Sequence, residues 1–357
     1  MKKNKLNLLV YTLSEPKLNQ GLGNVVLNVA NNLPFEKKIL FPVGRVKKLL
    51  FYSFLSPIWF ALKVKKINPD IVIVHSAEAS FDPILAKKLF GGDYKILTVA
   101  HGLNSGMLKA YSAEKKKGNT NSKRIFELNL KISAFRSKFI YLSDKVIAVS
   151  NYVKEELAKD YGTKSVVINN GVNKTKSGKL KKKFETILFG GNLYWLKGLH
   201  YLILANLQLK KPKTILAVGL AKNQQEFLKN NYNCSNVVFK NSMSFKKFEI
   251  LFKENDVFAM PSIYESFGIV YLQALANKMP VIASKNTGAE DIIVNKFNGC
   301  LTKKASVNEI KEALEFIDKN FEKISAAAKL EKRFLWKNIA KEYKNEIFAL
   351  HECTESK

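Results

Sequence analysis

Charged side chains and glycines stand directly after apolar runs at several places in this chain. In DVFAMPSIYESFGIVYLQ, Ser262 follows an apolar stretch, Glu265 lies in the loop, and Phe267, Gly268 and Ile269 begin a helix-like segment. The first N–H groups of a helix have no partner within it, so they are free to bind an anion. This stretch therefore predicts an anion site with one carboxylate beside it.

A second candidate lies upstream in GGNLYWLKGLHYLILA, residues 190–205. Its two glycines come at the end of a predicted strand, and Lys197 and Gly198 come near the start of a helix. A lysine at that place can neutralise a diphosphate bound at the helix N-terminus. The simpler interpretation is a solvated lysine at a helix cap.

Two histidines and two glycines mark the first half of the chain. His75 and His101 each follow a predicted strand, so we expect both to face a cleft between two sheets. Such a histidine is more often a structural hydrogen-bonder than a catalyst, and His101 is the better candidate because Gly102 allows close ligand approach. QGLGNVV places Gly21 and Gly23 before an apolar helix, but it lacks the third glycine, tight turn and acidic partner of a dinucleotide-binding fingerprint. This loop either offers backbone N–H groups to a phosphate or sugar, or is an ordinary loop.

The elements around these residues alternate between strands and helices. Short runs rich in β-branched residues are each followed by a helix-like stretch, which is typical of parallel sheets covered by helices on both faces. The fold class is therefore predicted to be α/β, with two tandem Rossmann-like doubly wound domains and an inter-domain cleft. We predict the strands at residues 6–12, 70–75, 95–101, 145–150, 165–172, 185–191, 214–219, 236–240, 256–262 and 280–284.

Length and composition also favour two domains. A chain of 357 residues is too long for one ordinary core. The lysine-rich run KTKSGKLKKK predicts a linker at 174–184, between an N-terminal domain at 1–173 and a C-terminal domain at 185–335. Three scattered cysteines argue against a disulfide scaffold or zinc site and are typical of a reducing compartment. We expect no signal peptide and no membrane-spanning helix, and therefore a cytoplasmic protein.

The balance of charges is unusual. The chain has 59 Lys and Arg against 30 Asp and Glu, a net charge of +29. Such a field attracts nucleotides, phospholipid surfaces or nucleic acid without choosing among them. The alternative is a lysine-rich bias spread over solvated surfaces.

Two segments fit this scheme less well. The run LLFYSFLSPIWFAL, residues 49–62, has no charge, contains Pro57, and is flanked by basic residues within 45–66. It is too short to span a bilayer, so we expect either a helix that is broken or kinked at Pro57 and packed on the first sheet, or an interfacial element on an anionic membrane. Residues 111–124, YSAEKKKGNTNSKR, are predicted to be a mobile basic loop.

Several motifs in sequence order resemble one known family over nearly the whole chain. They are KVIAVSNYVKEEL with VVINNGVN, then FGGNLYWLKG, then DVFAMPSIYESFGIVYLQALANKMPVIAS with GAEDIIVNKFNGCL, and finally FLWKNIAKEYKNEI. These motifs resemble those of the family-4 glycosyltransferases (glycosyl transferases group 1), which have the GT-B fold. The resemblance implies a nucleotide-sugar donor, net retention of anomeric configuration, and no cofactor or obligatory metal. It also implies that the last helix, within 336–357, packs back toward the first domain.

The resemblance implies a role for each matching residue. Gly23 falls in the glycine loop of the first domain, and His101 falls where a histidine approaches the donor sugar or the acceptor. Lys197 matches the lysine on the diphosphate. Glu265 matches the first glutamate of an E-x7-E motif, near the transferred sugar. The backbone of Phe267, Gly268 and Ile269 matches the segment that binds sugar and phosphate.

Two residues depart from the family pattern. The position after Gly191 that usually holds a second phosphate-binding arginine is Asn192, and the second glutamate of the motif is Gln273. Asn192 still donates a neutral hydrogen bond, and the Gln273 carbonyl still accepts one from a ribose hydroxyl. Both substitutions lose the strength that charge adds to a hydrogen bond, so we expect weaker donor binding more than a slower chemical step.

We therefore expect a transferase that moves a hexose to a glycan, lipid-linked or polysaccharide acceptor, with His101, Glu265 and Lys197 as catalytic residues. One alternative is a GT-B protein that has lost its chemistry and serves as a partner or scaffold. The other is a nucleic-acid-binding protein, which the charge alone supports because no RNP, helix-turn-helix or finger signature is present. The donor-binding set is expected to be Gly23, Gly191, Asn192, Lys197, Glu265, Phe267, Gly268, Ile269 and Gln273.

Overall fold

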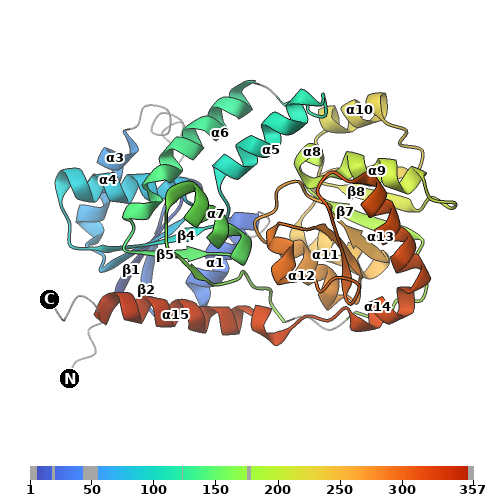
Figure 1. The fold of residues 1–357 in the computed structure, drawn as a ribbon. Coiled ribbons are helices and arrows are strands. Elements are labelled where there is room, and N and C mark those ends of the chain that lie inside the picture. The colour runs from blue at the N-terminus through green and yellow to red at the C-terminus, as the bar shows by residue number, and fades with distance from the viewer. Residues whose placement is uncertain (1–5, 18–20, 43–54, 123, 175–177, 353–357) are drawn as a thin grey trace. The chain divides into compact units, whose positions relative to one another are not determined.

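The computed structural model describes residues 6–17, 21–42, 55–122, 124–174 and 178–352. The chain divides into two compact units, each built on its own parallel sheet (Figure 1). The predicted α/β class with two doubly wound sheets is confirmed. The first unit comprises Met1–Leu108, Arg124–Gly171 and Leu335–Lys357, and the second comprises Lys109–Lys123 and Val172–Phe334.

The sheet of the first unit has six parallel strands among the described residues, in the order β2-β1-β3-β4-β5-β6. Every residue of β3 is buried, which explains why this strand reads as a continuous apolar run. The bounds are β1 Asn7–Tyr11, β2 Glu36–Leu40, β3 Ile71–His75, β4 Lys95–Ala100, β5 Lys145–Ala148 and β6 Val166–Val167.

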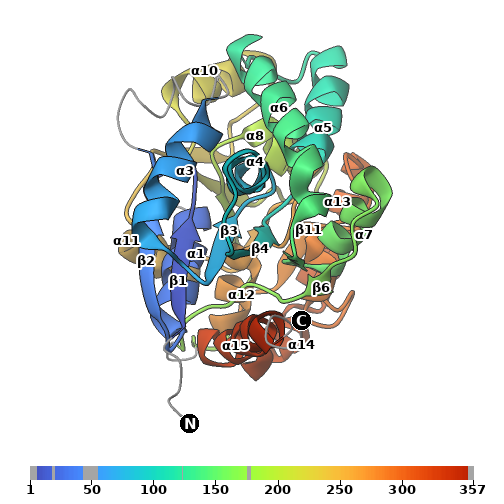
Figure 2. The same ribbon diagram turned by 90° about the vertical axis from the view of Figure 1, so that its left-hand side faces the viewer.

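Helices cover both faces of this sheet. Figure 2 shows α3 and α4 side by side over the strands, and the two helices pack against each other. The last helix, α15, lies along α1 on the other side of the sheet (Figure 1). The helices are α1 Gly21–Asn32, α3 Ser56–Ile67, α4 Phe81–Phe90, α6 Arg124–Ser137, α7 Asn151–Tyr161 and α15 Trp336–Glu352, with the short 3-10 helices η1 Glu78–Ser80 and η2 Lys138–Leu142.

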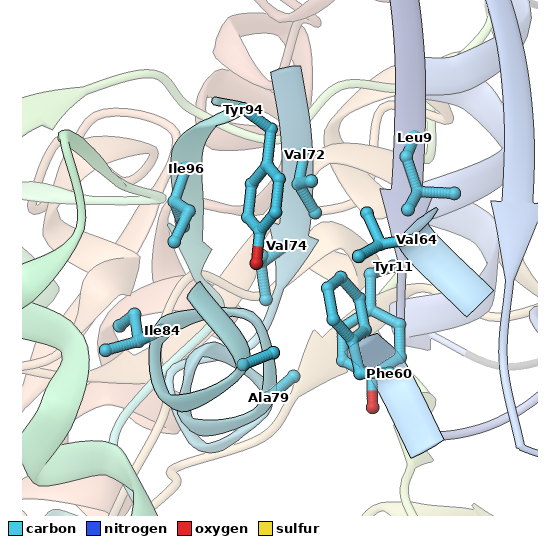
Figure 3. Close-up of a cluster of buried hydrophobic side chains, with 11 residues drawn as sticks. Leu9, Tyr11, Phe60, Val64, Val72, Val74, Ala79, Ile84, Tyr94 and Ile96 are labelled. Carbon is cyan, nitrogen blue, oxygen red and sulfur yellow. The ribbon is translucent and has the colours of Figure 1, made fainter. Parts of the chain in front are cut away.

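The core of the first unit lies between β1, β3 and the helices α3 and α4. Figure 3 shows the Tyr11 ring beside Phe60, and their centroids are 4.9 Å apart in an edge-to-face arrangement. Tyr94 also packs edge-to-face on Phe60, with the centroids 6.3 Å apart. Phe60 thus packs helix α3 against the sheet through aromatic contacts.

The uncharged segment at 49–62 is described only from residue 55 onward, because residues 43–54 lie outside the described residues. The described part is the start of α3, where Pro57 occupies the first turn. A proline there costs no hydrogen bond, so the helix is neither broken nor kinked by it. Within the described chain, no helix is both long and apolar enough to cross a membrane.

The sheet of the second unit also has six parallel strands within the described residues, in the order β12-β11-β10-β7-β8-β9. The strands are β7 Thr186–Gly190, β8 Thr214–Val218, β9 Val237–Lys240, β10 Val257–Ala259, β11 Val281–Ser284 and β12 Gly299–Thr302. Its helices are α8 Tyr194–Lys197, α9 Leu199–Leu207, α10 Lys222–Asn231, α11 Phe245–Glu254, α12 Ile269–Ala276, α13 Val307–Lys319 and α14 Phe321–Ala327, with η3 Gly288–Asp291 and η4 Lys332–Phe334.

The expectation of a mobile loop at residues 111–124 was wrong for its first half. Helix α5 runs from Asn104 to Lys116, and its second half belongs to the second unit. The fully buried Glu114 carboxylate accepts hydrogen bonds from His200 (3.1 Å) and Tyr201 (3.0 Å). Burial opposes ionisation there, but the hydrogen bonds outweigh it and lower the pKa of Glu114 to about 2. This buried anchor holds in place a lysine-rich segment that looks solvated in the sequence.

The lysine-rich stretch at 174–184 is described except for residues 175–177. Its described part packs on the second unit, where the Gly178 N–H donates to Ala276 O at 3.1 Å. A Cβ on Gly178 would lie 2.6 Å from the Cα of Asn277, so the contact requires a glycine. The Lys181 N–H also donates to the Ser325 hydroxyl.

Candidate functional site

Two loops meet at the carboxyl edge of the second sheet, where β7 and β10 are neighbours. The Ile263 N–H donates to Leu196 O at 2.8 Å, which joins the loop after β10 to helix α8. Gly198 makes this approach possible, because its φ is +76° and a Cβ there would lie 2.1 Å from Pro261 O. The contact places the side chain of Lys197 beside the loop that carries Glu265.

Lys197 and Glu265 form an ion pair at this junction. The Lys197 Nζ lies 2.8 Å from Glu265 Oε2, and the side chains are only 20% and 9% exposed. Gly191 lies against the stem of this lysine, since a Cβ on Gly191 would lie 3.0 Å from Lys197 Cγ. The structure therefore brings together two of the three predicted catalytic residues, although they are 68 positions apart.

Helix α12 begins next to this pair. Gly268 caps it with φ +92°, and a Cβ there would lie 2.3 Å from the Tyr271 ring. Phe267 is buried and packs near Phe334, with centroids 6.0 Å apart. Its side chain therefore anchors the loop, while the backbone from Phe267 to Ile269 presents the free N–H groups of the helix start.

Two further residues shape the loop and were not among the predicted site residues. The Tyr271 hydroxyl donates to Met260 O at 2.8 Å, which holds the end of β10 against α12. Burial raises the pKa of Tyr271 well above its ordinary value, so it remains a protonated donor. Gly288 donates its N–H to Glu265 O at 2.8 Å, and a Cβ there would lie 2.0 Å from Ser266 O. The Gly in GAEDII was the available signal, but its partner loop could not be read from the sequence.

The two departures from the family pattern differ in their surroundings. Gln273 lies in the middle of α12 and is 8% exposed, and its side-chain amide makes no hydrogen bond with any described residue. Asn192 is exposed in the loop between β7 and α8. The exposed Asn192 amide is thus available to a ligand, whereas the Gln273 amide is buried and has no hydrogen-bond partner among the described residues.

The remaining predicted residues belong to the first unit. His101 follows β4 and its ring nitrogen Nε2 lies 2.9 Å from Nδ1 of His75, the last residue of β3. Gly23 lies in the first turn of α1, where a Cβ would come 2.3 Å from the backbone N of Lys17. Close packing of the chain on itself therefore accounts for a glycine at that position.

The second-unit arrangement is suited to binding a phosphorylated ligand. Lys197 and the start of α12 are hydrogen-bond donors beside one carboxylate, and Asn192 directly follows Gly191, which lies against the lysine stem. Among the residues that the structure describes, no group of three or more His, Cys, Asp or Glu side chains is placed to hold a metal ion.

Family models match most of the chain in two overlapping segments. Residues 19–176 match "Glycosyltransferase Family 4", and residues 172–333 match "Glycosyl transferases group 1". The second match contains Lys197, Glu265 and α12. The two matches overlap at residues 172–176, directly after Gly171, where one segment of the first unit ends.

Curated relatives match over part of their length. An uncharacterized glycosyltransferase of Methanocaldococcus jannaschii is 31% identical over 173 residues, which is 48% of this chain and 49% of that protein. Two further uncharacterized glycosyltransferases of that organism align over 63% and 60% of their length. The chain thus spans 49% to 63% of the length of these relatives.

Solved structures match nearly the whole chain. Sucrose-phosphate synthase from Thermosynechococcus elongatus is 18% identical with a TM-score of 0.79, and the match covers 98% of this chain and all of that one. Anabaena HepE, solved in complex with UDP-glucose, is 18% identical with a TM-score of 0.73, over 96% of this chain and all of that one. At these identities the likeness is one of fold.

Proposed function

The chain belongs to the family-4 glycosyltransferases of GT-B fold, and on this premise we propose that it transfers a hexose from a nucleotide sugar to a hydroxyl of a glycan, lipid-linked or polysaccharide acceptor. The observation that carries the proposal is the Lys197–Glu265 ion pair beside the start of α12. A cation and free N–H groups bind a diphosphate, and a carboxylate binds sugar hydroxyls.

The diphosphate occupies the donor side of this arrangement. Lys197 turns from Glu265 to the phosphate oxygens when the donor binds, and the N–H groups at Phe267–Ile269 complete the anion site. Asn192 adds a neutral hydrogen bond, and Gly191 leaves room for the phosphate near the strand end. Gln273 accepts a hydrogen bond from a ribose hydroxyl.

The transferred sugar is oriented by Glu265. The family resemblance also assigns a sugar-binding role to His101 and Gly23. The bond between the anomeric carbon and the phosphate oxygen breaks, and its electron pair leaves with the nucleoside diphosphate. The acceptor oxygen forms the new bond on the same face, and its proton passes to the leaving phosphate oxygen. The barrier is mainly the developing negative charge, for which one positioned donor is worth about 3 kcal/mol.

We expect a UDP-hexose to be the donor, a choice supported by the UDP-glucose complex of the structural neighbour. In a thermal-shift screen of UDP-, GDP- and ADP-sugars, the matching donor should raise the melting temperature by about 5 °C at 100-fold excess over its Kd. Turnover should be insensitive to a chelator. If no nucleoside diphosphate or nucleotide sugar stabilises the chain, the scaffold alternative replaces the enzyme.

A variant that adds a positive charge tests whether Asn192 lies at the diphosphate site. Asn192→Arg restores a cation beside the diphosphate site, and a partly exposed ion pair of this kind is worth about 1 kcal/mol, or roughly fivefold in Kd. An unchanged affinity for UDP would place Asn192 away from the phosphates.

We also propose that the first unit binds an anionic membrane surface. Helix α3 exposes Ile58 and Leu62, the latter 65% exposed, next to the exposed Lys63, Lys65 and Lys66. Apolar side chains flanked by lysines are the composition of interfacial helices, and each lysine near anionic lipid adds about 1 kcal/mol.

Co-sedimentation with vesicles tests this surface. The chain should bind vesicles with anionic lipid at least fivefold more strongly than neutral ones, and Leu62→Glu should remove most of that difference because it places a carboxylate in the lipid interface. Phe297→Glu, at a position 58% exposed in the second unit, is the matched control. Equal binding to both vesicle types would refute the proposal.

A further inference from the structure

Two histidines form a hydrogen-bonded pair in the first unit. His75 is the last residue of β3, and His101 directly follows β4, the next strand in the sheet. The distance from His75 Nδ1 to His101 Nε2 is 2.9 Å, and the rings are nearly parallel, with an interplanar angle of 18°. Only one of these two nitrogens can carry the proton of this hydrogen bond.

The backbone around the pair is unusual. Ser76, directly after His75, has φ +98°, a conformation that a residue with a side chain adopts rarely. Its N–H is held by Val99 O at 2.9 Å, and Gly102 after the second histidine has φ +127°. Two uncommon backbone conformations therefore flank the pair, as is often seen where side-chain geometry serves a function.

Both rings are neutral near pH 7. Burial lowers the pKa of His75 well below its ordinary value, and the neighbouring ring adds to this effect. Burial likewise lowers the pKa of His101 to about 3. Each ring then carries one proton, and the pair has two arrangements. Either His75 donates to His101, or His101 donates to His75.

The surroundings of the outer nitrogens favour one arrangement. His75 is fully buried, and its Nε2 has no hydrogen-bond partner among the described residues. A proton on that atom would be a buried donor without an acceptor, which is the less tolerated kind of orphan. The favoured arrangement therefore puts the His75 proton on Nδ1, from which it is donated to His101 Nε2.

This arrangement determines what His101 offers to a ligand. Its Nε2 is occupied as an acceptor, so its own proton is on Nδ1. The ring is only partly buried, and Nδ1 makes no hydrogen bond with a described residue. That N–H is free to bind an oxygen atom.

We propose that His75 is a positioning residue that holds His101 in the Nδ1–H form, so that His101 is a fixed hydrogen-bond donor to a hydroxyl or ring oxygen of the sugar. The sugar as ligand rests on the proposed function, but the tautomer does not. A ligand with an ammonium group at this place would find no acceptor on His101.

The experiment uses 15N-histidine-labelled full-length protein and needs no substrate for its first arm. The chain has four histidines, so each ring can be assigned by single substitution. We expect the unliganded protein to show His101 protonated on Nδ1 and bare on Nε2. His75→Leu removes the donor and fills its buried position with an apolar side chain. In this variant His101 should shift toward the Nε2–H form.

His75→Asn is the rescue variant, because its side-chain amide nitrogen stands near the position of Nδ1 and can donate in its place. It should keep the Nδ1–H form and remains informative if the leucine variant folds poorly. An Nε2–H form of His101 in the unaltered protein, or an unchanged tautomer in a folded His75→Leu variant, would overturn the proposal.

The second arm measures donor KM and kcat. His75→Leu should raise the KM for the donor about fivefold, the effect of one misdirected neutral hydrogen bond, and His75→Asn should restore most of it. If the tautomer shifts but KM does not, the sugar is wrongly assigned as the ligand of His101, and that half of the proposal is overturned. A failure of the whole proposed function would instead appear as absence of turnover in the unaltered protein.

Discussion

Glu265→Gln is expected to lower kcat about 100-fold while it tightens the binding of the nucleoside diphosphate. The loss of rate follows because a neutral amide orients the sugar less strongly than a carboxylate does, and such positioned groups are worth 10²–10³ in rate. The gain in affinity follows because Lys197 lies 2.8 Å from Glu265 Oε2 and must leave this partner to reach a phosphate. Release from a partly buried ion pair of about 1 kcal/mol improves Kd roughly fivefold.

A lower kcat together with tighter UDP binding distinguishes this mechanism from general damage to the site, which would weaken both. Lys197→Met should lower both kcat and the affinity for UDP, because it removes the cation that binds the phosphate. It also leaves the Glu265 carboxylate, which is 9% exposed, without its partner. Lys222→Met, at an exposed position of the same unit, is the matched control and should change neither. UDP affinity by calorimetry and initial rates of transfer give the two readouts. Weaker UDP binding by Glu265→Gln would show that the ion pair does not compete with the phosphate.

Arg136→Met is expected to destabilise the first unit by about 3–5 kcal/mol. Arg136 and Asp82 are both fully buried and lie 2.6 Å apart. The same carboxylate accepts hydrogen bonds from Tyr11 and Ser56, so it connects β1, α3, α4 and α6. Removal of the guanidinium would leave this charge buried with neutral donors only, which costs far more than the net contribution of the ion pair.

The pH dependence of this loss has a definite sign. Burial raises the pKa of Asp82 above its ordinary value, and Arg136 opposes that rise. Without Arg136 the pKa of the folded state rises further, so between the unfolded and folded pKa values the folded state binds more protons. Stability then falls as pH rises, and the deficit of Arg136→Met should be smaller at pH 5.5 than at pH 7.5.

Urea unfolding at both pH values measures the effect. The double variant Arg136→Met with Asp82→Asn should recover much of the loss, because no buried charge is left unpaired. Arg333→Met is the matched control, since the Arg333–Glu331 pair is half-exposed and should contribute less than about 1 kcal/mol. A loss of similar size for both arginines would contradict the assignment.

The order of apolar and polar residues was sufficient to predict the central strands, and the sequence motifs were sufficient to identify the family. Residues 71–75 are apolar at nearly every position because β3 is buried on both faces, and such a strand is visible in any sequence. The strands β2, Glu36–Leu40, and β12, Gly299–Thr302, were not predicted. Both lie at sheet edges, where a strand has one neighbour, and neither has the apolar run of the predicted edge strands β6 and β9. β2 reads EKKIL, with three charged residues, and β12 reads GCLT, with only four residues.

The site residues could also be identified from their positions directly after predicted strands. Those positions did not show which residues would contact one another. That Lys197 meets Glu265 depends on β7 and β10 being neighbours and on the close approach at Gly198. That His101 meets His75 depends on β3 lying beside β4. That Arg136 meets Asp82 depends on α6 packing against η1, which directly precedes α4. Burial on each strand and helix is a local property that the order of residues encodes directly. Contact between residues 26 to 68 positions apart is a property of which elements become neighbours, and only the folded chain decides it.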